Sequence, residues 1–495
     1  MFCARINNEI EYNFSGSMLL SDILIAAGMN FPLPCGGNGT CGKCKVAVIG
    51  SLTPLSSEEV KKLTALEIEE NIRLACISTA IGDVEISCEI ADIHVETSGY
   101  SKDFVINNDY KSGIVIDIGT TTIAAKLYKN SQVVKTVTGL NEQSKFGADV
   151  ISRIDYTITN GKEALFEAIT MQLSGMIDRL GCQNPDIMVI TGNTTMLHFL
   201  TNLEAKGIAV SPFIPESLFG GYYNIMNKNT YIPRCVSAYV GADITCGILA
   251  AGMLEKNETS ILVDMGTNGE MAYYDNDGIL KTASTAAGPA FEGAGIFMGM
   301  PAKAGAINKV YVENGEIKYT TINGEKPIGI CGSGLIDCIA VMVKEGILDE
   351  TGIINDFDHN HIDLITEHED KPAFNISDSG VIITSKDIRQ IQLAKSAISA
   401  GIMTLLGDKT VDTLYIAGGF GAYISIENAE MIGLIPKGVY KETKILGNSA
   451  ITGAGLIFLS SEEREKSEKI AEIAVTTELS SNPEFMDYYV ENMFF

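Results

Sequence analysis

Four cysteines near the N-terminus have the types and spacing that metal-cluster chemistry requires. Cys35, Cys41 and Cys44 lie in the run CGGNGTCGKC with the spacing C-x5-C-x2-C, and Cys76 follows inside RLAC. Glycine fills the loop, and it readily adopts the positive φ angles that let a backbone fold around a cluster. Four thiolates match the ligand set of a [2Fe–2S] centre, which is a one-electron carrier. Structural zinc is the alternative, but it usually pairs two C-x2–4-C knuckles, and Cys76 has no second cysteine at that spacing.

A second set of candidate residues follows two similar apolar strands. The runs IVIDIGT at 114–120 and ILVDMGT at 261–267 match by residue class, and each strand ends in an aspartate, Asp117 or Asp264. Backbone amides and hydroxyls in such a turn suit phosphate oxygens, and the aspartate can hold hydrated Mg²⁺. One such turn is weak evidence because β-turns favour these residues, but two copies indicate a duplicated domain. The turn residues are Gly119, Thr120, Thr121 and Thr122 in the first copy and Gly266, Thr267, Asn268 and Gly269 in the second.

Glycines also follow two later strands. The run LYIAGGFG at 414–421 leads an apolar strand directly into Gly418 and Gly419. A backbone without side chains lets a flat nucleotide lie against the end of a strand, although a glycine-rich strand-to-helix turn is the alternative. Gly332 and Ser333 precede an apolar helix predicted over 335–343. The N-terminus of that helix can face a phosphate or an inter-domain hinge, or the glycines can serve helix packing alone.

Sequence patterns predict the elements that position these residues. Residues 1–95 alternate strands with one or two helices, and residues 96–111 form a polar linker of unknown stiffness. A helix followed by a tail is expected from residue 461 onward. In the N-terminal part we predict a hairpin over 2–14 turning at Asn7-Asn8, a helix over 18–27 stopped by Gly28, a strand over 45–49, a capping box from Ser56 and Glu59, and a closing strand over 84–90.

Composition narrows the classes of function. The 495 residues include 36 basic and 62 acidic side chains, a net charge of −26, which disfavours binding to nucleic acid or to an anionic membrane. Neither a signal-peptide pattern nor an apolar stretch long enough for a transmembrane helix is found, so no membrane association is expected. The other cysteines are scattered among apolar neighbours and are expected to be reduced. These features predict a cytoplasmic protein.

The motifs resemble known families. The cysteine loop and its surrounding pattern resemble the plant-type ferredoxin β-grasp, with the five-residue gap of the adrenodoxin-like ferredoxins. The two aspartate turns and the Gly418-Gly419 strand resemble the phosphate-1, phosphate-2 and adenosine motifs of the acetate and sugar kinase, heat-shock chaperone and actin superfamily. Together they resemble the reductive activators of corrinoid proteins. The implied fold is an α+β β-grasp ferredoxin domain (1–95), the linker (96–111), a duplicated α/β actin-like (ribonuclease H-like) ATPase domain with a central cleft (112–460, halves at about 112–245 and 246–460), and a C-terminal helix and tail (461–495).

This resemblance implies an ATP-dependent reductive activator. Such a protein transfers one electron through a [2Fe–2S] cluster and returns the cobalt(II) of a corrinoid protein to cobalt(I), within a methyltransferase or O-demethylase system. The implied partners are that corrinoid protein and an unidentified low-potential reductant, and a homodimer is left open. The alternatives are an ATP-coupled electron donor for a different enzyme and a small-molecule kinase, which would not need a cluster. Longer relatives insert a middle domain between the two modules, where this chain has only the linker. The implied cofactors are the cluster on Cys35, Cys41, Cys44 and Cys76, ATP on the turn and glycine residues above, and Mg²⁺ near the catalytic Asp117 and Asp264.

Overall fold

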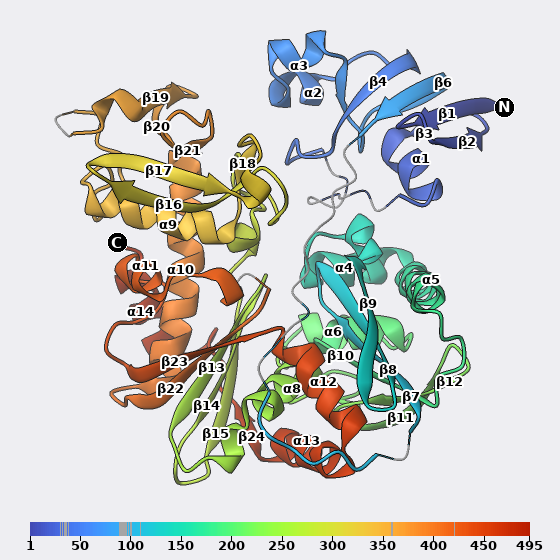
Figure 1. The fold of residues 1–495 in the computed structure, drawn as a ribbon, viewed down its shortest axis with the longest axis vertical. Helices are drawn as coiled ribbons and strands as arrows, with labels where there is room; N and C mark the ends of the chain where they lie inside the picture. Colours follow the sequence, from blue (N-terminus) through green and yellow to red (C-terminus); the bar gives the residue numbers. More distant parts are fainter. Residues whose placement is uncertain are drawn as a thin grey trace. The chain divides into compact units, whose positions relative to one another are not determined.

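The computed structural model describes residues 1–495 apart from 30, 32, 34–36, 38, 89–96, 98, 100, 109, 358–359 and 420 (Figure 1). The predicted ligand Cys35 therefore lies outside the described residues. The chain divides into two compact units, of which one comprises Met1–Ile93 with Gly139–Ile169 and the other His94–Thr138 with Thr170–Phe495.

The N-terminal residues form a β-grasp sheet. The strand order is β2-β1-β6-β4-β5, with β3 paired to β6, and β1 runs parallel to β6 while the other pairs are antiparallel. Helix α1 places Ile23 and Leu24 in the core of this sheet. The elements are β1 (Phe2–Ile6), β2 (Ile10–Phe14), β3 (Met18–Leu19), α1 (Leu20–Ala26), β4 (Lys45–Leu52), α2 (Ser57–Lys62), α3 (Ala65–Glu69), β5 (Ile72–Leu74) and β6 (Thr79–Ser87).

Local predictions in this unit are confirmed, with shifted boundaries. Asn7 and Asn8 have positive φ angles in the β1–β2 turn, and Ser56 forms its capping box with Glu59. The helix begins two residues later than predicted, because Met18 and Leu19 pair with β6 before the helix starts. The strand predicted over 45–49 continues to Leu52, and the predicted closing strand is β6, which ends at Ser87. Residue 90 lies outside the described residues.

The second unit begins with a mixed sheet of order β11-β12-β10-β7-β8-β9. Strand β7 (Ser112–Ile118) pairs antiparallel with β8 (Thr122–Lys129) and parallel with β10 (Ile187–Gly192). The remaining strands are β9 (Gln132–Leu140), β11 (Gly221–Ile225) and β12 (Lys228–Ile232). The helices of this part of the unit are α6 (Thr194–Leu200), α7 (Lys206–Ala209) and α8 (Ala242–Ala251). Between β9 and β10 in the sequence, α4 (Val150–Asn160) belongs to the first unit, and α5 (Glu163–Leu180) begins in the first unit and ends in the second.

A second mixed sheet repeats this plan, with the order β23-β22-β13-β14-β15-β24. Strand β13 (Ser260–Met265) pairs antiparallel with β14 (Gly269–Tyr274) and parallel with β22 (Val411–Ala417), as β7 does with β8 and β10. The predicted duplication is therefore confirmed in the strand topology, and with it the actin-like fold class. The outer strands are β15 (Leu280–Thr285), β23 (Tyr440–Gly447) and β24 (Ala474–Thr476).

Helices and two small sheets complete the second half (Figure 1). Helix α9 (Gly332–Lys344) lies against β16 (Ala306–Glu313), and the long helix α10 (Ser385–Leu406) contacts β14 and β15. None of the helices in the described part of the chain combines the length and apolar character needed to cross a bilayer. The other elements are β17 (Glu316–Thr321), β18 (Gly329–Ile330), β19 (Ile365–His368), β20 (Lys371–Asn375), β21 (Ile382–Thr384), α11 (Ile426–Met431), α12 (Ser449–Leu459), α13 (Ser461–Ile473) and α14 (Pro483–Glu491).

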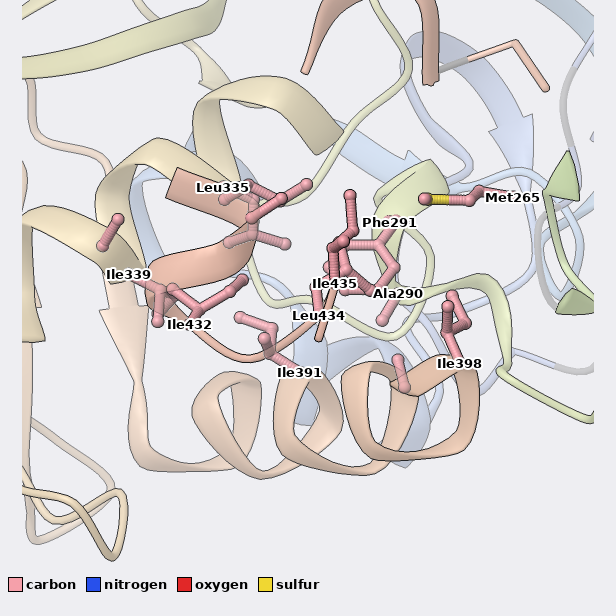
Figure 2. Close-up of a cluster of buried hydrophobic side chains, with 14 of the residues drawn as sticks. Met265, Ala290, Phe291, Leu335, Ile339, Ile391, Ile398, Ile432, Leu434 and Ile435 are labelled. Atoms are coloured by element: carbon pink, nitrogen blue, oxygen red, sulfur yellow. The ribbon is translucent and has the colours of Figure 1, made fainter. Parts of the chain in front are cut away.

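One hydrophobic cluster supports the second aspartate turn. Met265 at the end of β13, Phe291 of the short helix η3 (Pro289–Glu292) and Ile398 of α10 belong to this cluster (Figure 2). Each of the three is almost fully buried. Burial of a side chain of this size stabilises by about 1.5–3 kcal/mol. The cluster therefore fixes η3, and with it Glu292, next to the turn that follows β13.

Candidate nucleotide and cluster sites

The two aspartate turns lie next to each other. The Gly119 amide donates to the Thr122 carbonyl at 2.9 Å, and the Gly266 amide donates to the Asn268 carbonyl at 3.0 Å, so both turns are tight. The Thr121 and Thr267 hydroxyls donate to the two oxygens of Glu292 at 3.0 and 3.1 Å. Those hydroxyl oxygens are 3.4 Å apart. Two motifs distant in the sequence thus form one site, with Glu292 joining them.

Carboxylates gather around these turns. Burial raises the pKa of Asp117 to about 6, against the opposing effects of the Asn448 amide and Lys126. Burial and the neighbouring Asp117 and Glu292 raise the pKa of Asp264 to about 7. Burial, together with Asp117 and Asp264, raises the pKa of Asp243 to about 8. Anions held this close in a weakly solvated site favour a cation among them.

Two further carboxylates extend this acidic group. Glu270 stands opposite Asp264 in the β13–β14 pair, and burial with the charges of Asp243 and Asp264 raises its pKa well above the usual range. Burial also raises the pKa of Glu292, although the two threonine hydroxyls oppose that shift. Asp243 and Glu270 were not predicted from the sequence. In the first half the position facing Asp117 is occupied by Ala124, so the internal repeat gave no signal for Glu270.

Two asparagines join helix N-termini to the first turn. Asn193 caps α6 and donates to the Thr120 hydroxyl at 3.0 Å. Asn448 caps α12 and donates to an oxygen of Asp117 at 3.0 Å. Each follows a strand that ends in glycine, in the runs GNT and GNS. That repeated run is the signal that could have identified Asn448, which the sequence analysis did not single out.

The predicted adenosine motif packs against the second aspartate turn. Gly418 has a φ of +99°, and a Cβ there would lie 2.4 Å from the Met265 carbonyl oxygen and 2.9 Å from Asp264 Oδ1. Its amide donates to the Gly447 carbonyl at 3.1 Å. A Cβ at Gly419 would instead meet nothing within 4 Å. Gly418 is therefore required for close packing, whereas the backbone of Gly419 borders open space.

Local contacts surround the remaining predicted nucleotide residues. The Asn268 amide donates to Glu270 at 3.4 Å, and a Cβ at Gly269 would lie 3.1 Å from Ile398 of α10. Gly332 and Ser333 open α9, and the Ser333 hydroxyl donates to the Asn308 carbonyl at 3.0 Å. This contact favours the packing interpretation for Ser333.

These residues fit Mg²⁺ and a nucleotide. Mg²⁺ usually keeps several waters and takes one or two carboxylates plus substrate phosphates, which the half-buried Asp117 and Asp264 next to two amide-rich turns can provide. Among the described residues no three or more ligating side chains converge in the geometry of a metal site by themselves. The carboxylates alone thus do not form a closed protein cage, in keeping with an ion that is bound partly through phosphates.

Cys44 and Cys76 lie in the core of the β-grasp sheet. The Sγ atoms of Cys44 and Cys76 are 3.1 Å apart, beyond the length of a disulfide of about 2.05 Å. Two thiolates on one tetrahedral metal with bonds near 2.3 Å are separated by roughly 3.8 Å, so a small side-chain adjustment suffices. Gly39 and Gly42, on either side of Cys41, have φ angles of +70° and +66°. The described cysteines therefore fit a cluster, and the fourth ligand of the predicted set is Cys35.

A buried ion pair holds the Cys76 segment. Glu59 is fully buried and accepts from the Arg73 guanidinium at 2.8 and 3.0 Å. The same carboxylate accepts from the Leu74 amide at 3.2 Å and from the Ser78 hydroxyl at 2.6 Å. These partners lie on both sides of Cys76 in the sequence, so Glu59 fixes the backbone that carries this predicted ligand.

Family models match nearly the whole chain. One described as a 2Fe-2S iron-sulfur cluster binding domain matches residues 5–80. One described as the RACo middle region matches 112–256, and one described as the C-terminal domain of RACo, the ASKHA domain, matches 258–495. The family model named for the middle region matches inside the predicted ATPase domain, over the β7–β12 sheet and α8, and not within the 96–111 linker.

Individual relatives agree with these matches. The chain is 31% identical to the corrinoid activation enzyme RamQ of Eubacterium limosum over 98% of both chains. It is 27% identical to a Co(II) methylated amine-specific corrinoid protein reductase of Methanosarcina barkeri, over 73% of this chain and 72% of that protein. A solved structure titled as a reductive activator for corrinoid, iron-sulfur protein has a TM-score of 0.70 and 30% identity, and covers 100% of this chain and 98% of its own.

Proposed function

The chain belongs to the family of reductive activators of corrinoid proteins, and from this premise we propose that it reduces an inactive cobalt(II) corrinoid protein to cobalt(I). In this proposal one electron passes through the [2Fe–2S] cluster, ATP is hydrolysed in the same cycle, and the corrinoid protein serves a methyltransferase or O-demethylase system. The observation that carries the proposal is the occurrence of a cluster-type cysteine loop and two joined nucleotide turns in one polypeptide. A small-molecule kinase would require only the second of these.

The nucleotide roles follow from the contacts. The amides and hydroxyls of residues 119–122 and 266–269 bind phosphate oxygens, and the open backbone at Gly419 receives the adenosine. Asp117 and Asp264 hold hydrated Mg²⁺, which would neutralise phosphate charge as the terminal phosphoryl group leaves. Glu292 keeps the two turns in register through Thr121 and Thr267.

The cysteine loop has the electron-transfer role. Cys35, Cys41, Cys44 and Cys76 are the proposed ligands, and the cluster that they hold supplies a single electron. The chain's own residues determine where that electron is presented: Glu59 and Arg73 fix the Cys76 segment, and the glycines on either side of Cys41 allow the loop to turn.

A physical reason exists for consuming ATP. Plant-type clusters have potentials near roughly −400 mV. Each ~59 mV that a single electron must be driven uphill costs about 1.4 kcal/mol. A cobalt(I) corrinoid is a still stronger reductant, so electron transfer from the cluster to cobalt(II) is unfavourable by itself. The nucleotide must therefore change the free energy of that transfer within the complex. Nucleotide binding can do this only if the protein binds two states of its partner with different affinity.

The organisation of the chain is part of this proposal. We assign residues 1–95 to the electron carrier, 96–111 to a linker, 112–245 and 246–460 to the two halves of the ATPase, and 461–495 to a C-terminal segment. The sequence predicts a helix and tail for that segment, and the structure has α13, β24 and α14 there. The corrinoid protein is the electron acceptor, and a separate low-potential reductant recharges the cluster. Whether two copies of the chain act together is a matter for measurement of the native mass.

The proposal is tested by mixing the cluster-loaded protein with excess reductant and a cobalt(II) corrinoid protein. We expect cobalt(I) absorption to develop with Mg-ATP and to stay absent with a non-hydrolysable analogue. Equal cobalt(I) formation with and without nucleotide would overturn the proposal. Phosphorylation of a small acid or sugar by the same preparation would favour the kinase alternative.

A further inference from the structure

The segment between the two proposed modules makes hydrogen bonds to helices of the second unit along much of its described length. The Lys102 amide donates to the Ala250 carbonyl at 3.1 Å, and the Asn107 amide donates to the Leu459 carbonyl at 3.1 Å. The Asn108 side chain donates to the Phe458 carbonyl at 2.9 Å. Residues 97–108, in their described part, thus lie along α8 and α12 and are hereafter called the linker strap.

A buried ion pair strengthens this attachment. The Lys102 side chain is 7% exposed and its ammonium contacts the carboxylates of Glu255 and Glu463. Glu463 belongs to α13 and is itself buried. A buried charge without its partners is strongly unfavourable, so these contacts hold the linker strap to the ATPase rather than leaving it in solvent.

Near its N-terminal end, the linker strap contacts Gly447, which lies next to the predicted nucleotide residues. Gly99 forms an antiparallel bridge with Gly447. A Cβ at Gly99 would lie 2.4 Å from the Thr452 hydroxyl, 2.8 Å from the Leu446 carbonyl oxygen and 3.0 Å from the Asn448 carbonyl oxygen. The approach of the two backbones is therefore close enough to require glycine at position 99.

Residues 447–448 contact three segments: the first aspartate turn, the predicted adenosine motif and the linker strap. The Asn448 amide donates to Asp117 of the first turn, and the Gly447 carbonyl accepts from the Gly418 amide of the adenosine motif. Gly447 also pairs with Gly99 of the linker strap. Asp117 and Gly418 are thus each one hydrogen bond away from residues 447–448, and Gly447 pairs directly with the linker strap.

We propose that the Gly447-Asn448 corner couples nucleotide binding to the linker strap, with Asn448 as the positioning residue that senses Asp117. This inference rests on the proposed function, because it gives the ATP site a route toward the electron carrier. Nucleotide binding engages Asp117 and the Gly418-Gly419 strand end together, fixes the corner between them and strengthens the pairing with Gly99. Coupling of this kind is reciprocal: weakening the attachment of the linker strap must weaken nucleotide binding by the same factor.

Hydrogen exchange on the full, cluster-loaded chain tests this coupling. With Mg²⁺ and a non-hydrolysable ATP analogue, exchange of the Lys102 and Asn107 amides should slow by about fivefold or more, the range typical of coupled sites. Gly99→Ala should abolish this slowing and weaken binding of the analogue by a similar factor. Asp103→Ala is the matched control, since Asp103 lies in the same segment with an exposed side chain and should behave as the parent.

Asn448→Asp gives an independent test at the other end of the path. An aspartate can still cap α12 by accepting from the Ile451 amide, but it cannot donate to Asp117. We expect parental exchange of the linker strap without nucleotide and no slowing with the analogue. Slowing that persists in both Gly99→Ala and Asn448→Asp would overturn the inference, as would binding of the analogue to the parent with no change in exchange.

The exchange measurement requires no corrinoid protein, so it separates the two hypotheses. Nucleotide-dependent exchange without cobalt(I) formation would contradict the proposed function and leave the coupling intact. ATP-dependent cobalt(I) formation with nucleotide-independent exchange would contradict the coupling alone.

Discussion

Gly418 lies against Asp264 so closely that a Cβ on the glycine would be 2.9 Å from the aspartate oxygen. The strand β22 that ends at Ala417 is the parallel neighbour of β13, which carries Asp264. The adenosine motif and the second aspartate turn are thus adjacent parts of one sheet edge, and a change at one is transmitted to the other by direct contact.

This contact predicts different outcomes for two neighbouring glycines. Gly418→Ala adds a methyl group at a φ of +99° and within 2.4 Å of a carbonyl oxygen, so it should lower the thermal midpoint and abolish nucleotide binding. Gly419→Ala meets no atom within 4 Å and should keep the parental midpoint while weakening nucleotide binding. Thermal unfolding with and without nucleotide measures both effects. Equal midpoints for the two variants would contradict the packing role of Gly418.

The aspartates should be dispensable for folding and required for hydrolysis. Asp117→Asn and Asp264→Asn each remove a negative charge that its surroundings disfavour, so neither should lower stability in the absence of nucleotide. Each should reduce Mg-ATP hydrolysis by about 100-fold or more, because an ion or water partner is lost. Asp277→Asn, at an exposed turn, is the control for a general charge effect. Parental hydrolysis rates in both variants would remove these residues from the mechanism.

The cluster prediction is independent of the nucleotide site. Cys41→Ser and Cys44→Ser should eliminate the visible absorption of the purified protein while leaving nucleotide binding unchanged, since the affected loop belongs to the other unit. Metal analysis should give about two irons and two sulfides per parental chain. Zinc in place of iron in protein prepared without oxygen would support the structural-zinc alternative.

Glu59 gives the β-grasp unit a specific pH dependence. Burial would raise the pKa of Glu59, but hydrogen bonds from Arg73, the Ser56 amide, Ser78 and the Leu74 amide outweigh it and lower the value from 4.5 to about 2. A carboxyl with a lowered folded-state pKa stabilises above its unfolded value, and this contribution is lost as the pH falls from about 4.5 through about 2. It amounts to roughly 3 kcal/mol at neutral pH.

Replacement of Glu59 tests that expectation. Glu59→Gln should destabilise the unit most at pH 7, and the difference from the parent should shrink as the pH falls below about 4.5. Urea unfolding followed through hydrogen exchange of the Leu74 amide provides the measurement, because the cluster loses its sulfide in acid and its absorption cannot be used there. Glu69→Gln, an exposed position on α3, should show no such pH-dependent difference. A difference that is independent of pH would show that the carboxylate charge is not what stabilises the Cys76 segment.

Sequence and structure agree where the information is local. The strand-and-turn pattern at the two aspartates and the capping box at Ser56 each depend on residues close together in the chain, and such patterns can be recognised directly in the sequence. The duplicated strand topology followed from the same repeat. Boundaries were less accurate, as at Met18 and Leu19, because pairing with a distant strand outweighed the helical pattern.

The residues that the sequence did not reveal depend on long-range packing. Asp243 lies at the start of α8 and joins the site only because that helix lies beside the sheets. Asn448 reaches Asp117 across 331 positions of sequence. Gly99 lies in a segment with the composition of a polar linker, and its requirement for glycine follows from the Thr452 hydroxyl and the carbonyl oxygens of Leu446 and Asn448, which are distant in sequence. No local pattern distinguishes Asp243 or Gly99 from ordinary cap and linker residues, whereas the repeated GNT and GNS runs are a local signal for Asn448.

The most direct test of the central claim is a single-turnover measurement. The cluster of the parental protein is reduced, free reductant is removed, and an equimolar cobalt(II) corrinoid protein is added with Mg-ATP, with a non-hydrolysable analogue, or with no nucleotide. If the protein is a one-electron carrier coupled to ATP, up to one cobalt(I) forms per cluster, and only with Mg-ATP. The visible absorption of the oxidised cluster should return to the same extent. The same yield of cobalt(I) without nucleotide would contradict the account.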